Sequence, residues 1–135
     1  MKRKTFVTIV APLAALIGIV ALFYPSVLLE SKGVNSGEPV KVWMSEVGIL
    51  LISTGIVLFL VRKEQVSIAL KAIFFGNIII QIGLLTIEIL AYQNGVIKEV
   101  SGIIPNSILH ILLLFGFTYY LVKMTTHNKV SCEKP

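Results

Sequence analysis

The chain has 135 residues, of which 56% are hydrophobic and only 14% are charged, a composition far from that of an average soluble domain. A helix needs about 20 apolar residues to cross a bilayer, so four crossings use nearly the whole chain and leave no room for a soluble catalytic domain. The formal net charge is +5, but the basic residues lie at the ends of apolar segments, which favours the lipid bilayer over nucleic acid as a partner. We therefore expect an all-α, integral membrane four-helix bundle that forms a single transmembrane domain over residues 1–135.

The first apolar segment, about residues 6–24, follows the basic start MKRK. A cleaved signal peptide also begins with basic residues, but its apolar core has about 7–15 residues and ends at a small-residue cleavage site. The segment here is longer, and its end, ALFYPS, has no such site. We expect a retained helix, followed by an extracytoplasmic loop over about residues 25–42, where Gly, Pro, Asn and Ser indicate irregular structure.

Three further helices are expected over about residues 43–61, 66–92 and 103–122, with a cytoplasmic tail over about 123–135. The link RKEQ is so short that the second and third helices must be antiparallel neighbours. The tail holds Cys132, the only cysteine, which excludes a CxxC redox pair and an internal disulfide. Because Arg3 and Arg62 are the only arginines, the chain has little means of gripping a phosphate in two-pronged fashion, which weakens any proposal of phospholipid headgroup chemistry.

The distribution of Lys and Arg among the loops predicts the orientation of the bundle. One side of the membrane would receive the basic residues Lys2, Arg3, Lys4, Arg62, Lys63, Lys71, Lys123, Lys129 and Lys134. The other side would receive only Lys32, Lys41 and Lys98. Because the basic side is normally cytoplasmic, both termini are expected in the cytoplasm. The outer interface would then hold three amphipathic rings, those of Tyr24, Trp43 and Tyr92.

Small residues form stripes on three of these helices when the residues are placed at 100° intervals. The stripes are Ala11, Ala14, Gly18 and Ala21 in the first helix, Gly48 and Gly55 in the second, and Ala69, Gly76 and Gly83 in the third. Such stripes let helix backbones approach closely, which matters in lipid because the hydrophobic effect gives no help to helix association there. We interpret them as packing surfaces. The alternative interpretation is that the glycines clear space for a ligand.

Polar residues of the third helix also share one face. Asn77, Gln81, Glu88 and Tyr92 fall within an arc of roughly 60°. Glu88 is one turn in from Tyr92, about 6 Å below the outer interface. Because ionisable side chains inside a membrane normally face protein or a water-filled space, we expect this face to turn toward the other helices.

The fourth helix offers a partner for Glu88. One of its faces carries, at helical spacing, Asn106, His110, Leu113, Phe117 and Tyr120. His110 is one turn in from Asn106, so its depth matches that of Glu88. A Glu and a His held together in low dielectric would have shifted pKa values, as proton relays and acid/base pairs have. Alternatively, the two side chains only tie the helices together.

Glu46, at the start of the second helix, lies at the same outer end. We therefore predict a shallow, outward-facing polar pocket with a cavity reachable from outside. Its ligand-binding residues would be Glu46, Asn77, Gln81, Glu88, Asn106 and His110, and its catalytic candidates would be Glu88 and His110. For Asn77 and Gln81, interhelical hydrogen bonding is the simpler interpretation. No metal is expected, because zinc normally takes three or four close ligands, and no cofactor is assigned.

Two stretches carry a resemblance to a known family: EVGILLISTGIVLFLVRK and IPNSILHILLLFGFTYYLVK. Together with the four short helices, they are similar to the DoxX-like superfamily of small four-helix bacterial membrane proteins, over about residues 43–123. Some members are subunits of quinone-linked thiosulfate oxidation or belong to membrane redox complexes. The resemblance implies a multi-pass protein of the bacterial cytoplasmic (inner) membrane, and no functional residue is carried over from it.

The resulting expectation is an accessory subunit, or a protein that binds a small apolar ligand such as a quinone-like molecule or a lipid. A membrane protein or a second copy of the chain would be its partner. Two alternatives stay open. One is a proton-coupled transporter of small molecules that uses Glu88 and His110, and the other is an intramembrane acid/base enzyme that acts on an apolar substrate.

Overall fold

A computed structural model describes residues 1–34 and 37–132, with side chains described as far as Thr126. Its helices are α1 (Arg3–Phe23), α2 (Pro25–Glu30), α3 (Glu38–Val61), α4 (Ile68–Gln93) and α5 (Val100–Cys132). The described part of the chain contains no strand, which confirms the all-α prediction. The side chains of Lys129 and Cys132, and Lys134 altogether, lie outside the described residues.

Four of the helices are long and apolar enough to cross a membrane: α1, α3, α4 and α5 as far as Thr126. The first turn of α3 lies earlier than predicted because Gly37 and Pro39 supply a start signal, proline being tolerated where backbone N–H groups have no helical partner. α2 occupies part of the predicted loop. It is separated from α1 at Tyr24 (φ −132°), since the residue before a proline disfavours helical geometry. α5 continues through most of the predicted tail.

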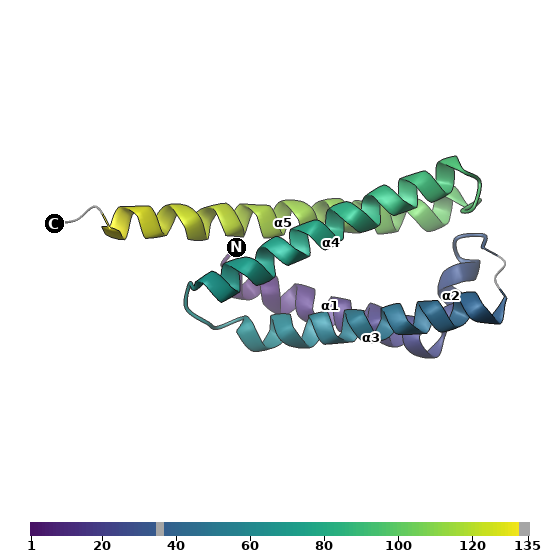
Figure 1. Cartoon of the computed structure of the whole chain (residues 1–135), viewed down its shortest axis with the longest axis horizontal. Coiled ribbons are helices and arrows are strands. Elements are labelled where there is room, and N and C mark those ends of the chain that lie inside the picture. Colours follow the sequence, from purple (N-terminus) through teal and green to yellow (C-terminus); the bar gives the residue numbers. More distant parts are fainter. Residues whose placement is uncertain (35–36, 133–135) are drawn as a thin grey trace.

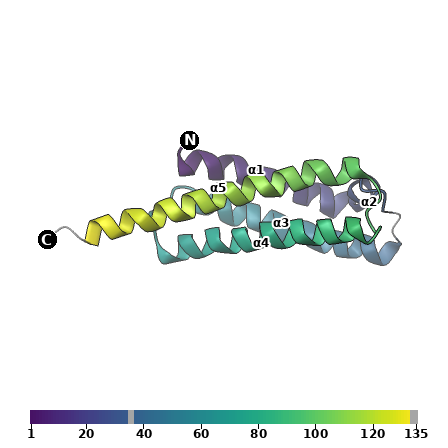
Figure 2. The same ribbon diagram turned by 90° about the horizontal axis from the view of Figure 1, so that it is seen from above.

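The long helices form two packed pairs, α1 with α3 and α4 with α5 (Figure 1). The start of α1 and the α3–α4 link lie at one end of the molecule, which we call the basic end (Lys2, Arg3, Lys4, Arg62 and Lys63). α2 and the α4–α5 connection lie at the opposite end, the α2 end, as the view from above also shows (Figure 2). α3 and α4 run antiparallel, as predicted from their short link, but the prediction that they are neighbours was wrong, because α3 packs against α1.

The glycine stripes of the first two predicted helices bring α1 and α3 into contact. A Cβ added at Gly18 would lie 2.7 Å from the Gly48 carbonyl oxygen, and one added at Gly55 would lie 2.7 Å from the Ala11 carbonyl oxygen. This packing interpretation is confirmed. The stripe on α4 is different, because a Cβ at Gly76 or Gly83 would have no atom within 4 Å. The prediction that this stripe packs against another helix of the same chain was therefore wrong.

An aromatic cluster of Phe6, Phe74, Phe117 and Tyr120 joins the two pairs in the half of the bundle next to the basic end. The ring centroids of Phe6 and Phe117 lie 5.2 Å apart, and those of Phe74 and Phe117 lie 5.3 Å apart, both edge to face. This is a favoured geometry for aromatic pairs. Phe74 and Phe117 are fully buried. The interior of this half is therefore filled with apolar rings.

Candidate functional site

The predicted polar face of the third membrane segment is the buried face of α4. Asn77, Gln81 and Glu88 are 6%, 7% and 6% exposed, so the helix turns all three away from its surroundings. Tyr92, the fourth member of the predicted face, is 42% exposed. The polar face therefore enters the bundle at Glu88 and continues toward its middle.

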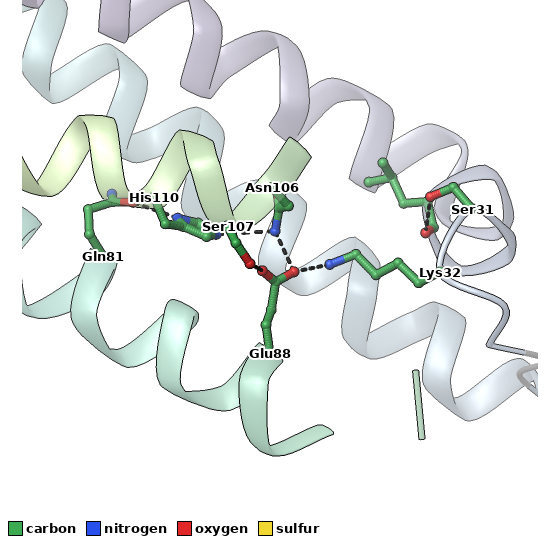
Figure 3. Close-up of polar contacts among 8 residues, drawn as sticks. Ser31, Lys32, Gln81, Glu88, Asn106, Ser107 and His110 are labelled. Atoms are coloured by element: carbon green, nitrogen blue, oxygen red, sulfur yellow. Dashed lines mark hydrogen bonds and ion pairs between the residues drawn. The ribbon is translucent and has the colours of Figure 1, made fainter. Parts of the chain in front are cut away.

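Glu88 is held by three side chains from two other elements (Figure 3). Lys32, just after α2, forms an ion pair with Glu88 Oε1. Asn106 Nδ2 on α5 donates to the same oxygen, and Ser107 Oγ donates to Oε2 at 3.5 Å. The carboxylate thus has a counter-ion and hydrogen-bond donors, which a buried charge requires.

His110 continues this line of contacts deeper into the bundle. Its Nδ1 lies 2.7 Å from Gln81 Oε1, and its Nε2 lies 3.2 Å from Asn106 Nδ2. A neutral ring with its proton on Nδ1 satisfies both contacts, because Nδ1–H then donates to Gln81 while Nε2 accepts from Asn106. Asn106 consequently bridges Glu88 and His110. We call the connected set the polar chain: Lys32, Glu88, Asn106, Ser107, His110 and Gln81.

Two of the six predicted ligand-binding residues do not join the polar chain. Asn77 is buried, but its Nδ2 donates to the Ile73 carbonyl of its own helix at 2.9 Å. Glu46 is exposed on α3. Gly48 and Gly55 face α1, and at 100° per residue Glu46 points to the opposite side of the helix. The structure therefore brings together four of the predicted residues, Gln81, Glu88, Asn106 and His110.

Lys32 and Ser107 are the members of the polar chain that the sequence analysis missed. Lys32 is fixed by its backbone, because its carbonyl accepts from Lys98 N at 3.2 Å and from Glu99 N at 3.3 Å. Gly33 follows with a φ of +66°, a left-handed conformation that glycine adopts without penalty. Charge balance in the sequence could have pointed to Lys32. A buried Glu at the outer end needs a cation, and only three lysines were expected on that side.

A cavity was predicted beside Glu88 and His110, but the two hollows described in the structure lie elsewhere. One of these lies at the basic end, and the other lies beside Pro12 between α1 and α3. Every buried side-chain nitrogen and oxygen of the described residues has a hydrogen-bond partner. The polar side chains are therefore satisfied by one another, and the half-buried members Lys32, Asn106 and Ser107 form the accessible edge of the polar chain.

Replacing Gly102 with alanine is expected to loosen the polar chain from outside. A Cβ at Gly102 would lie 2.2 Å from the Ser31 carbonyl oxygen and 2.7 Å from Lys32 Cα. The segment that carries Lys32 must then move, and we expect the free energy of unfolding to fall by about 1–3 kcal/mol. Thermal unfolding of the purified protein measures this. Gly76→Ala, which lies inside a helix and has no neighbour within 4 Å, is the control, and equal melting temperatures would contradict the prediction.

The side chains of the polar chain can exchange their hydrogen bonds with one another for hydrogen bonds to a ligand. The polar chain places an ammonium group, a carboxylate, an amide and an imidazole in one line (Figure 3), and their N–H donors suit a carbonyl or phosphate oxygen. Compared with known proteins, the whole 135-residue sequence matches no protein-family model, no curated protein and no solved structure.

Proposed function

We propose that the chain is a multi-pass protein of the bacterial cytoplasmic membrane that binds the polar head of a small apolar molecule, quinone-like or a lipid, as an accessory subunit of a membrane complex. Four helices of sufficient length and apolarity support the bilayer assignment. The gathering of Lys and Arg at the basic end supports cytoplasmic termini. The resemblance to the DoxX-like superfamily supports the class of ligand and the accessory role.

The observation that carries this proposal is the division of the bundle interior into a polar half and an apolar half. The polar chain begins at Lys32 at the α2 end and reaches inward to Gln81. Beyond it lies the aromatic cluster, with Phe74 and Phe117 fully buried. A molecule with a carbonyl head and an apolar body matches such an interior, since the head exchanges hydrogen bonds at one depth while the body contacts apolar side chains.

The proposed binding step is an exchange of partners at Asn106. Its amide donates to both Glu88 and His110, so a ligand carbonyl can accept one of these hydrogen bonds in place of a protein atom. Gln81 holds the His110 ring in place during this exchange. Because Glu88 or His110 gives up the hydrogen bond that the ligand gains, the exchange contributes at most about 0.5–1.5 kcal/mol, and most of the affinity must come from the apolar body.

The other two expectations are weaker proposals. A transporter needs a polar route to both sides, whereas the aromatic cluster fills the interior between Gln81 and the basic end. An acid/base enzyme needs a free carboxylate or imidazole next to its substrate, whereas both oxygens of Glu88 and both nitrogens of His110 already have partners.

Fluorescence of Trp43, the only tryptophan, offers a test, because Trp43 is exposed near the start of α3 and quinones quench indole emission. We expect saturable quenching when the protein in mild detergent is titrated with a short-tailed quinone. Asn106→Leu should weaken the affinity about tenfold, since it removes the donor that the carbonyl uses and a tenfold change corresponds to 1.4 kcal/mol.

Asn77→Leu is the matched control for this titration, because it removes a buried amide that bonds only to its own helix. Its affinity for the quinone should stay within twofold of the unmodified protein. Quenching that never saturates, or an equal loss of affinity in both variants, would count against the proposed site.

A further inference from the structure

We propose a second binding site, for a phosphate-bearing anionic group, in a hollow at the basic end. The hollow has a volume of 330 Å³ and is lined by Lys2, Arg3, Lys4, Val66, Tyr120, Lys123 and Met124. It lies at the opposite end of the molecule from the polar chain and shares no residue with it. The site goes beyond the proposed function and rests only on its bilayer assignment.

The charge of this hollow is uncompensated within the part of the chain whose side chains the structure describes. Four of its lining residues are basic and none is acidic, and the first turn of α1 contains no acidic residue. Among the described side chains the ion pairs are Lys32–Glu88 and Lys41–Glu38, so none of the four cations is paired within that part of the chain. Like charges gathered in one place repel each other, and a bound anion relieves this repulsion.

Specific contacts hold the walls of the hollow in place. Arg3 Nη2 donates to the Glu64 carbonyl in the α3–α4 link, and Arg3 Nη1 lies 3.5 Å from Met124 Sδ on α5. The buried Tyr120 hydroxyl donates to the Met1 carbonyl at 2.7 Å. The start of α1 is thereby fixed against α5 and the link, and the remaining N–H donors of Arg3 stay available to a ligand.

The lining of the hollow is partly apolar, and this points to a lipid as the source of the anion. Apolar surface comes from Val66, Met124 and the Tyr120 ring, which line the hollow together with the four basic residues. A phospholipid presents the same sequence of chemistry, a phosphate followed by apolar carbon, and basic pockets between helices on the cytoplasmic side suit anionic headgroups. The scarcity of arginine is no obstacle, since lysine binds phosphate as a point charge. Free phosphate has the same anionic group but no apolar part.

Native mass spectrometry of the full chain in neutral detergent tests the site. The probes are short-chain phosphatidylglycerol, phosphatidylcholine as the zwitterionic comparison, and inorganic phosphate as a competitor. The double variant Lys4→Gln/Lys123→Gln removes two cations from the hollow. Lys63→Gln/Lys71→Gln removes two cations from the same end that do not line it, so both variants lose the same charge.

We expect one phosphatidylglycerol to bind tightly and its affinity to fall about 10- to 30-fold in Lys4→Gln/Lys123→Gln, with less than a threefold change in the control. Displacement of the lipid by millimolar phosphate would support the site with free phosphate as its ligand. Equal binding of phosphatidylcholine, or equal losses in the two variants, would overturn it. Asn106→Leu should leave this binding unchanged, so failure of the quinone site and failure of this site are distinguishable.

Discussion

Replacing Lys32 with methionine is expected to lower the free energy of unfolding by about 3–5 kcal/mol, the range seen when one partner of a buried ion pair is removed. Glu88 is only 6% exposed, so its carboxylate would stay buried without its counter-ion. The Asn106 and Ser107 donors would still reach Glu88, but hydrogen bonds alone offset only part of the desolvation of a charge. Unfolding in mixed micelles of sodium dodecyl sulfate, followed by circular dichroism, measures the change.

Glu88→Gln should be milder than Lys32→Met, because the two partners are buried to different extents. The Lys32 side chain is 20% exposed against 8% for Glu88, so an unpaired ammonium group can reach water at the α2 end. Glutamine also keeps an oxygen that accepts from Asn106. The double variant should recover most of the stability lost in Lys32→Met, since it leaves no buried charge. The reverse order of the two single variants would contradict the ion-pair interpretation.

Helical periodicity predicted the facing sides of α4 and α5, although it missed Ser107 and wrongly included Asn77, whose side chain bonds to its own helix. Gln81 and Glu88 share a face of α4, and Asn106 and His110 share a face of α5, so an antiparallel pairing brings the two faces together. The predicted match in depth between His110 and Glu88 was wrong: Asn106 contacts Glu88, and His110 contacts Gln81, about two turns deeper on α4. The angle of a residue around its helix depends only on its position in that helix, whereas the register between two helices also depends on the segment that connects them. Asn106 was predicted on the same face of α5 as His110, but its position in the helix did not indicate that it bridges Glu88 and His110.

The positions of the Lys32 and Glu46 side chains depend on contacts between segments, which helical periodicity cannot predict. The place of Lys32 is set by the left-handed Gly33 and by Gly102, which lets the Ser31 carbonyl approach α5. These are contacts between segments about seventy residues apart in sequence. Glu46 was wrongly assigned to the polar pocket. Because α3 is apolar on most sides, the position of this one polar residue did not show which face of the helix is packed. The glycines Gly48 and Gly55 determine it.

The two glycine stripes on α3 and α4 look alike in sequence but differ in the structure. Gly48 faces the backbone of α1, whereas Gly76 and Gly83 face no atom that an added Cβ would touch. A stripe of small residues therefore predicts that close approach is sterically allowed, and the arrangement of the helices decides whether it occurs. This difference supplies a matched pair of substitutions within one chain.

Gly48→Ala is expected to lower the free energy of unfolding by about 3 kcal/mol, the upper part of the range for overpacking. The new Cβ would lie 2.6 Å from Leu22 N and 2.7 Å from Gly18 O. Both are backbone atoms, so no rotamer change can relieve the clash and the two helices must separate. In the bilayer proposed for this protein, helix association depends on close van der Waals packing, so separation weakens contacts along the whole α1–α3 pair.

Gly83→Ala is the control for this substitution, because its Cβ would have no neighbour within 4 Å. It should leave stability unchanged or raise it by up to about 1 kcal/mol through helix propensity. Unfolding of both variants in the same mixed micelles gives the comparison. If Gly48→Ala is as stable as Gly83→Ala, the close approach of α1 and α3 does not hold the bundle together, and the pairing of α4 with α5 through the polar chain must do so instead.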